Sequence, residues 1–336
     1  MIIFDERQKQ SLTEFGIEIP VHDSRATLTF ESLKSHPVLG PQISDWHIDT
    51  IREKVSKDDL LRVHSKKYVE NLFSDNLENE IIRTYELIDA QGRYYRYNPA
   101  NARLPLIQLF DRVLLKVSAT IQCCRVALEK GFCFSFGGGN HHAQRDYGAG
   151  FCLVNDIVIA VRKLQVENRI ATVWVIDLDA HKGDGTAALT RDDRSIITLS
   201  IHMARGWPLD GSKYDSEGNL NPSFIPGDFD IPIARGEDHL YVSRLQQGLQ
   251  EMDKMPLPDM AIVVSGVDPY EADELPSADG LKLSLDQMMA RDMLVYRFLK
   301  KRGIPRAYLM AGGYGSKSWQ AYVQFLEWVL LDNLKP

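Results

Sequence analysis

Short apolar runs that alternate with helix-period segments constrain the fold of this chain more than any other feature. The runs have the length of strands, most are rich in β-branched residues, and they lie at 132–136, 171–176, 196–201, 261–264 and 307–310. Continuous apolar runs of this kind are typical of parallel strands buried on both faces. Helix-period segments lie between them, at 114–128 before Gly131 and at 151–166, 237–254 and 285–302. The alternation predicts an α/β layered fold with a largely parallel sheet.

The composition and charge are those of an ordinary globular protein. The 336 residues are 44% apolar and 25% charged, and they contain neither an internal repeat nor a linker-like stretch. We therefore expect a single domain over residues 1–336. The 39 Lys and Arg residues against 46 Asp and Glu residues leave a net charge of −7. This charge disfavours a nucleic-acid partner and is compatible with a cationic substrate.

The sequence predicts neither export nor membrane insertion. Its cysteines are too few and too unevenly placed for a disulfide framework; they are Cys123, Cys124, Cys133 and Cys152. The N-terminal stretch has no apolar core of the signal-peptide type, and no apolar run reaches the roughly 18 residues that a membrane helix needs. We therefore expect a protein of the reducing cytoplasm, with no membrane partner.

Residues that can carry chemistry directly follow four of the predicted strands. These segments are GGGNHH at 137–142, DLDAHKGDG at 177–185, SGVD at 265–268 and AGGYG at 311–315. In open parallel sheets, ligands bind beyond the carboxyl ends of the strands. We therefore expect the four segments to converge on one site.

Asp179, His181 and Asp268 are the candidate metal ligands. Asp179 and His181 are two residues apart, so their side chains point the same way if the backbone is extended there. Two carboxylates and an imidazole with an open position suit catalytic Zn²⁺ or Fe²⁺, because structural zinc sites are usually closed by four Cys or His ligands. The alternative is that these are turn-forming and capping residues. We favour the metal because several strand ends carry His and Asp together.

A histidine pair and a tyrosine are the candidate proton-transfer groups. His141 and His142 follow three glycines, and paired imidazoles can act as a base and as an electrostatic stabiliser. Asp177 and Asp184 can each accept a hydrogen bond from the far nitrogen of one of these histidines, which would fix its tautomer. Tyr314 can donate its hydroxyl to a developing oxyanion. Core histidines and a packing tyrosine are the alternative interpretation.

These motifs resemble those of the zinc-dependent histone deacetylase superfamily. The likeness covers most of the chain and rests on GGGNHHAQRDYGAGFCLVND at 137–156 together with DLDAHKGDG, SIH, SGVD and AGGYG. An earlier Val63-His64 pair is similar to a motif that this superfamily carries upstream. Three features are most similar to the class IV branch: the triple glycine before the histidines, the DLDAH sequence, and the segment from Arg291-Asp292 to Pro305.

The resemblance implies the arginase/deacetylase fold, with three αβα layers and helices on both faces of the sheet. The zinc ligands would be Asp179, His181 and Asp268. The catalytic residues would be His142, His141, Tyr314, Asp177 and Asp184. His142 would be the general base and acid, His141 its electrostatic partner, and Tyr314 the group that polarises the scissile carbonyl.

The resemblance also implies a substrate tunnel and a second cation. Gly150 and Phe151 match the narrow apolar tunnel that holds the lysine stem. Potassium is expected at a site formed by Asp177, Asp179, His181 and Ser200. The implied reaction is hydrolysis of an acyl-lysine amide, in which an acetyl or longer acyl group leaves the ε-amine of a protein lysine.

Other functions stay open at this point. The first is a deacetylase of acetylpolyamines or another small acylated amine, and the segment 85–101 would form the rim that decides between substrates. The second is an arginase-like ureohydrolase, which needs a second metal and an Asp-x-Asp pair, whereas Gly266 stands two residues before Asp268. The third is a catalytically silent acyl-lysine binder, although such a protein should have lost a ligand, a histidine or the tyrosine.

Overall fold

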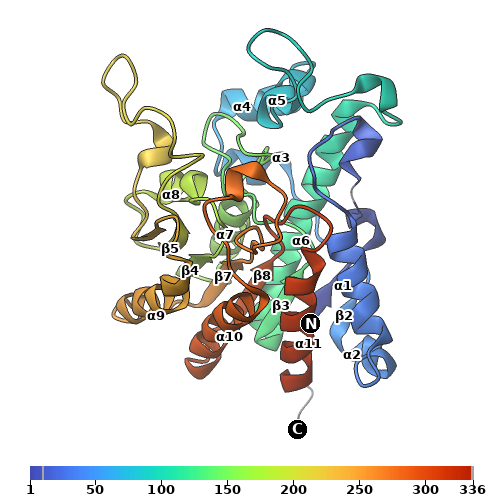
Figure 1. The fold of residues 1–336 in the computed structure, drawn as a ribbon, viewed down its shortest axis with the longest axis vertical. Coiled ribbons are helices and arrows are strands. Elements are labelled where there is room, and N and C mark those ends of the chain that lie inside the picture. The colour runs from blue at the N-terminus through green and yellow to red at the C-terminus, as the bar shows by residue number, and fades with distance from the viewer. Residues whose placement is uncertain (10, 334–336) are drawn as a thin grey trace.

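The computed structural model describes residues 1–9 and 11–333 and contains an eight-stranded, all-parallel sheet (Figure 1). The strand order is β2-β1-β3-β8-β7-β4-β5-β6. The strands are β1 (Ile2–Ile3), β2 (His47–Ile48), β3 (Phe132–Ser135), β4 (Val173–Asp177), β5 (Ile196–Met203), β6 (Phe229–Ile233), β7 (Met260–Val264) and β8 (Arg306–Leu309). The parallel α/β prediction is confirmed. Strands β1, β2 and β6 were not predicted from the sequence.

Helices cover both faces of the sheet, so the three-layer αβα prediction is confirmed. One face carries α1 (Ser24–Ser35), α9 (Tyr241–Met252), α10 (Leu285–Lys301) and α11 (Trp319–Asn333). The other carries α6 (Leu109–Lys130) and α7 (Asp156–Val166), joined by α3 (Lys57–Leu61), α4 (Lys66–Leu72) and α5 (Leu77–Thr84). The short helices α2 (Ile43–Trp46) and α8 (Asp184–Thr190) complete the set.

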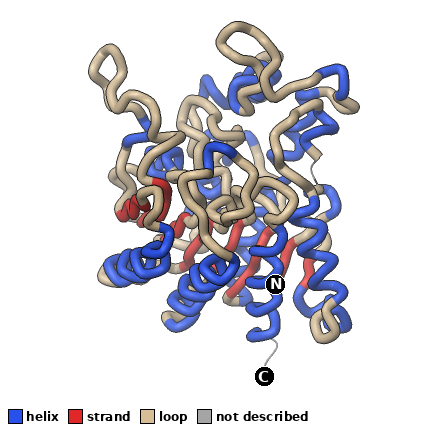
Figure 2. The backbone as a smooth tube through the Cα atoms, viewed as in Figure 1, coloured by secondary structure: helices blue, strands red, loops and turns tan. Residues whose placement is uncertain are grey.

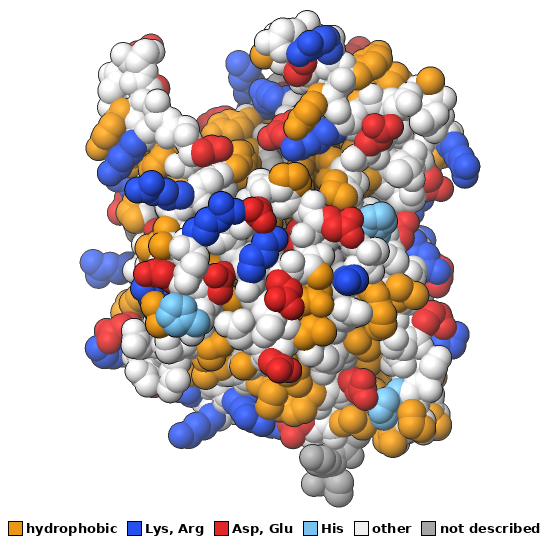
Figure 3. Space-filling model, in the orientation of Figure 1, with side chains coloured by type: hydrophobic (Ala, Val, Ile, Leu, Met, Phe, Trp, Pro, Cys, Tyr) orange, Lys and Arg blue, Asp and Glu red, His pale blue; other side chains and the backbone are white. Residues whose placement is uncertain are grey.

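Alternate residues of the central strands pack into the two cores. On β4, Trp174 and Ile176 pack with the first group of helices, whereas Val173 and Val175 pack with the second. This is the two-residue period of a strand buried on both faces. Lys, Arg, Asp and Glu side chains are interspersed over the face of the molecule in Figure 3. No helix within residues 1–9 and 11–333 is both long and apolar enough to cross a membrane.

Local signals explain the helix boundaries. Helix α6 ends at Lys130 and is capped by Gly131, whose φ of 79° is left-handed, as a C-terminal glycine allows. Ser284 and Gln287 form a capping box at the start of α10. Helix α7 begins at Asp156 instead of residue 151, because the Asn155 side chain accepts a hydrogen bond from the Val158 amide and caps the helix there.

The register of the sheet places four strand ends at one level. Ser135 of β3 pairs with Leu309 of β8, which pairs with Val264 of β7, which in turn pairs with Asp177 of β4. The four strands that precede the chemical motifs are therefore neighbours whose carboxyl ends are aligned. Figure 2 shows loops gathered on this side of the sheet.

Candidate active site

The three candidate metal ligands meet in the structure. His181 Nδ1 lies 3.1 Å from Asp179 Oδ1 and 3.0 Å from Asp268 Oδ2, and all three side chains are buried. Strand β4 ends at Asp177, so Asp179 and His181 belong to the bend that follows it and are not in extended backbone as expected. Their side chains still converge, because the Asp179 carboxylate accepts the backbone amide of His181 at 3.1 Å.

Glycines make room for this cluster. A Cβ at Gly312 would overlap Asp179 Oδ2 and would lie 2.8 Å from Asp268 Oδ2. The Gly312 amide instead donates to Asp179 Oδ2 at 3.0 Å. The candidate ligand atoms of Asp179, His181 and Asp268 all lie within 4.8 Å of one another. Two buried carboxylates and one imidazole at such separations fit a single divalent ion of the zinc or ferrous type.

Each histidine of the pair forms a hydrogen bond with one of the two candidate carboxylates. His141 Nδ1 lies 2.6 Å from Asp177 Oδ2, and His142 Nδ1 lies 2.7 Å from Asp184 Oδ1. The second oxygen of Asp184 accepts hydrogen bonds from Gln144 at 3.0 Å and Ser223 at 2.7 Å. Both Nδ1 atoms are thereby engaged, which leaves each Nε2 as the nitrogen able to exchange a proton with a substrate.

The two imidazoles have different charge preferences. Burial opposes protonation of His141, but the carboxylates of Asp177 and Asp179 outweigh it and raise its pKa to about 9. Burial and the neighbouring charge of His141 lower the pKa of His142 to about 4, against the pull of Asp184. At neutral pH His141 is therefore positively charged and His142 is neutral. A charged imidazole can stabilise negative charge, and a neutral one can accept a proton.

The predicted tunnel residues line an outer cavity of about 180 Å³ beside the cluster. Phe151 lies between Tyr85 and Tyr314, with ring centroids 6.1 and 6.3 Å away. Gly150 has φ of 53° and Phe151 has φ of 66°, a strained value for an aromatic residue. A side chain at Gly150 would meet His142 and the Trp207 ring. A residue larger than glycine would therefore not fit at position 150. That Gly150 and Phe151 form a substrate tunnel stays a prediction.

An ion pair between Arg96 and Glu86, not predicted from the sequence, lines this cavity. Arg96 Nη1 lies 2.5 Å from Glu86 Oε2, and both residues line the cavity. The Arg96 guanidinium also lies 5.5 Å from the Phe151 ring centroid. Two residues of the predicted rim segment 85–101 are therefore at the opening, while Tyr94 and Tyr95 are exposed.

Three residues outside the predicted set hold the site loops in place. Arg291 is fully buried and donates to the carbonyls of Leu178 at 3.0 Å and Gly266 at 2.8 Å. Asp156 accepts the amides of Gly139 at 3.0 Å and Asn140 at 2.7 Å. His64, noted only as part of an early motif, accepts the Asn155 amide at 3.1 Å and lies 2.8 Å from the Gln144 carbonyl.

The residues expected to hold potassium also lie together. Ser200 pairs with Asp177 across β4 and β5, and its hydroxyl accepts the Gly183 amide at 3.4 Å. The Asp179 amide donates to Asp177 Oδ1 at 3.2 Å. Potassium binding stays a prediction.

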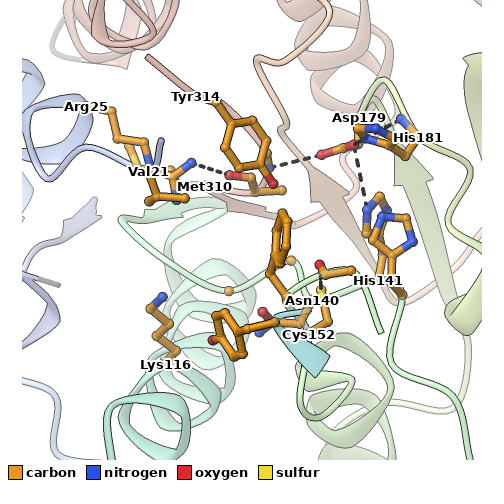
Figure 4. A pocket seen from close by; sticks show the side chains of 18 of the residues that line it. Val21, Arg25, Lys116, Asn140, His141, Cys152, Asp179, His181, Met310 and Tyr314 are labelled. Atoms are coloured by element: carbon orange, nitrogen blue, oxygen red, sulfur yellow. Dashed lines mark hydrogen bonds and ion pairs between the residues drawn. The ribbon is translucent and has the colours of Figure 1, made fainter. Parts of the chain in front are cut away.

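Figure 4 shows how the site is assembled around one pocket. Asp179 and His181 lie at one end of it, with His141 below them, and Tyr314 extends across the middle. The burial of Tyr314 and the nearby carboxylates of Asp268 and Asp179 raise the pKa of its hydroxyl well above the usual value, so the phenol keeps its proton and remains a hydrogen-bond donor.

Comparisons with known proteins identify the family of this chain. The histone deacetylase domain model matches residues 19–328. An uncharacterized protein of Picosynechococcus is 31% identical over 205 residues, covering 61% of this chain and 63% of that protein. Histone deacetylase 2 of Arabidopsis thaliana is 29% identical over 278 residues, covering 82% of this chain and 65% of that protein. The chain thus spans slightly less than two thirds of the length of these two relatives.

A more distant relative and a solved structure extend the likeness. The acetoin utilization protein AcuC of Staphylococcus aureus is 25% identical over 312 residues, covering 91% of this chain and 75% of that protein. The HD domain of HDA15 superposes with a TM-score of 0.68 at 18% identity, covering 99% of this chain and 89% of that one, and shows the same fold. These findings leave the likeness to the class IV branch a prediction. This chain belongs to the histone deacetylase superfamily.

Proposed function

We propose that this protein is a metal-dependent hydrolase that removes an acetyl or longer acyl group from the ε-amine of lysine. One observation carries the proposal. Asp179, His181 and Asp268 converge beside the His141–Asp177 and His142–Asp184 pairs, and Tyr314 lines the same cavities as His142 and His181. A ligand cluster, a base and an oxyanion donor that face one pocket are the groups that amide hydrolysis requires.

A divalent ion would be held by Asp179, His181 and Asp268. Zn²⁺, or Fe²⁺ in its place, would supply a water of lowered pKa and a polarised carbonyl when bound. A single ion is supported, because a side chain at position 266 would overlap Asp179 Oδ2 and so no second carboxylate fits there. This argues against the two-metal, arginase-like alternative.

The residues of the chain then divide the proton transfers. His142 accepts a proton from the water as its oxygen bonds to the carbonyl carbon, and Asp184 stabilises the imidazolium that results. Tyr314 donates a hydrogen bond to the developing oxyanion, and His141, paired with Asp177, adds positive charge nearby. His142 returns the proton to the departing nitrogen as the C–N bond breaks, which leaves a carboxylic acid and a free amine.

The lining of the outer cavity supports a substrate with an apolar stem. Phe151 and Trp207 both line that cavity, so a lysine stem would lie against aromatic side chains. A small acylated amine is the alternative substrate, and a relative named for acetoin utilization covers most of this chain. We place the acyl-lysine substrate first because the chain matches the histone deacetylase domain over residues 19–328.

The test is a turnover panel with a metal analysis on the same samples. The zinc-loaded protein is assayed on acetyl-lysine peptides, long-chain acyl-lysine peptides and acetylpolyamines, and bound metal is counted per chain. We expect one ion per chain and hydrolysis of at least one acyl-lysine peptide in preference to acetylpolyamines. Two tightly bound ions, or turnover of acetylpolyamines alone, would contradict the proposal.

A further inference from the structure

A second cavity of about 90 Å³ adjoins the proposed metal ligands Asp179 and His181. It shares His142, Gly150, Phe151, His181 and Tyr314 with the outer cavity, so the two meet at the proposed reaction centre. Its lining also includes two basic side chains that the proposed reaction does not use, Arg25 and Lys116. Figure 4 shows both on the side of the pocket opposite Asp179 and His181.

Lys116 is a cation that makes no ion pair with the residues that the structure describes. It comes from the middle of α6 and is partly buried, yet its ammonium makes neither a hydrogen bond nor an ion pair with any residue in the described part of the chain. Burial, reinforced by the charge of Arg25, lowers its pKa to about 8, so most Lys116 side chains remain protonated at neutral pH. A buried ammonium with no partner is costly, so such a group favours a ligand that supplies negative charge.

Two acids attract Lys116 electrostatically, Asp156 and, more weakly, Asp23, and neither lines the cavity. The two carboxylate oxygens of Asp156 already accept four hydrogen bonds. The donors are Thr120 Oγ1, the Gly139 amide, and the Asn140 amide and side chain, at 2.5 to 3.0 Å. Among the described residues that line the cavity, Asp179 carries the only carboxylate, and it lies at the metal end.

Arg25 supplies the second charge and is held rigidly. Its Nη1 donates to the carbonyls of Ala311 at 2.7 Å and Gly313 at 3.0 Å. Its Nε and Nη2 donors make no hydrogen bond to the described residues. A guanidinium fixed by one nitrogen, with its other donors unused, matches a carboxylate.

The size of the cavity limits the ligand. A cavity of about 150 Å³ holds the six carbons of benzene, or about 25 Å³ for each heavy atom. By that measure a cavity of about 90 Å³ holds about four heavy atoms. Beyond the scissile carbonyl, malonyl has four heavy atoms and succinyl has five. Acyl groups of this length would bring a terminal carboxylate to the cavity end that Arg25 and Lys116 line.

We propose that Arg25 and Lys116 form a receptor for the terminal carboxylate of a short dicarboxylic acyl group, of malonyl to succinyl length, carried by the substrate. This inference rests on the proposed function and specifies its acyl group. The reaction is the same hydrolysis: water adds to the acyl carbon, the C–N bond breaks, the amine takes the proton, and a dicarboxylate is released.

The test compares charged acyl groups with neutral groups of the same shape. Peptides of one sequence carry succinyl-lysine or 4-methylpentanoyl-lysine, in which an isopropyl group replaces the carboxylate. We expect the zinc-loaded protein to favour succinyl in kcat/KM, and Lys116→Met to lower the succinyl to 4-methylpentanoyl ratio at least tenfold. Lys130→Met, at the exposed end of the same helix, is the matched control and should leave the ratio unchanged. Equal ratios in wild type and Lys116→Met would overturn the inference.

A binding measurement separates this inference from the proposed function. We expect millimolar succinate to raise the thermal unfolding midpoint of the wild type more than that of Lys116→Met, whether or not any peptide is hydrolysed. Equal shifts would overturn the carboxylate receptor. Hydrolysis of no acyl-lysine peptide, with the Lys116-dependent shift retained, would overturn the proposed function alone.

Discussion

Replacing Arg291 by methionine should separate the stability of the fold from the geometry of the metal site. Arg291 lies on α10, beneath the loops that follow β4 and β7, and is fully buried. Its guanidinium lies 2.8 Å from Asp292 Oδ1 and donates to the carbonyls of Leu178 and Gly266. Leu178 lies next to Asp179, and Gly266 lies two residues before Asp268, so one side chain holds the backbone of two proposed ligands.

The size of the effect follows from these contacts. Arg291→Met leaves the Asp292 carboxylate buried without its partner, which typically costs about 3–5 kcal/mol. The protein should stay folded, because domains usually have about 5–15 kcal/mol of stability. In Arg291→Met with Asp292→Leu, both charges are gone, and we expect most of this loss to be recovered. The carbonyls of Leu178 and Gly266 still lack a donor in the double variant, so the metal site should remain impaired.

Two measurements check this reasoning. Urea unfolding of the metal-free proteins gives the stability difference, and competition with a zinc chelator gives the metal affinity, which we expect to fall about 10–100-fold in both variants. Arg297→Met, on the exposed side of the same helix, is the control and should cost less than about 1 kcal/mol. Zinc affinity equal to wild type in both Arg291 variants would refute the positioning role.

Three further predictions follow from the site. Tyr314→Phe should keep its metal but lose about 10²–10³-fold in kcat, because an oxyanion donor is removed; turnover and metal analysis on one sample check this, and a normal rate would exclude Tyr314 from the mechanism. Gly312→Ala should weaken zinc binding at least about tenfold in chelator competition, because its Cβ would displace Asp179 and Asp268. Burial lowers the pKa of His64 to about 4, so the unfolded chain, with an ordinary pKa near 6.5, binds its proton first. Protonation of this residue should therefore lower the free energy of unfolding by about 3 kcal/mol as the pH drops from 6.5 to 4. In urea unfolding, the midpoint of His64→Gln should fall less over this pH range than that of the wild type. An equal fall in both proteins would contradict the assignment.

The strands and helices that could be predicted are those with a clear pattern in a short stretch of sequence. Strands β3, β4, β5, β7 and β8 are marked by apolar runs because both of their faces are buried, and α6 and α10 are marked by their periodicity and caps. Two-residue strands such as β1 carry no periodic signal, and half-exposed β6 includes Pro232, so neither strand is predictable from its sequence pattern. The motif loops could be placed near one another because parallel strands end at a common edge.

The sequence by itself determined the α/β layers, the strand ends that carry chemistry and the set of acids, imidazoles and tyrosine found there. Only the tertiary structure decided which arginine and lysine side chains lie near these residues. Arg25 contacts a carbonyl 286 positions away, and Arg291 contacts one 113 positions away. In the sequence these side chains and Lys116 look like solvated residues of amphipathic helices, because a helical pattern records which face is apolar but not what the rest of the fold brings against the polar face.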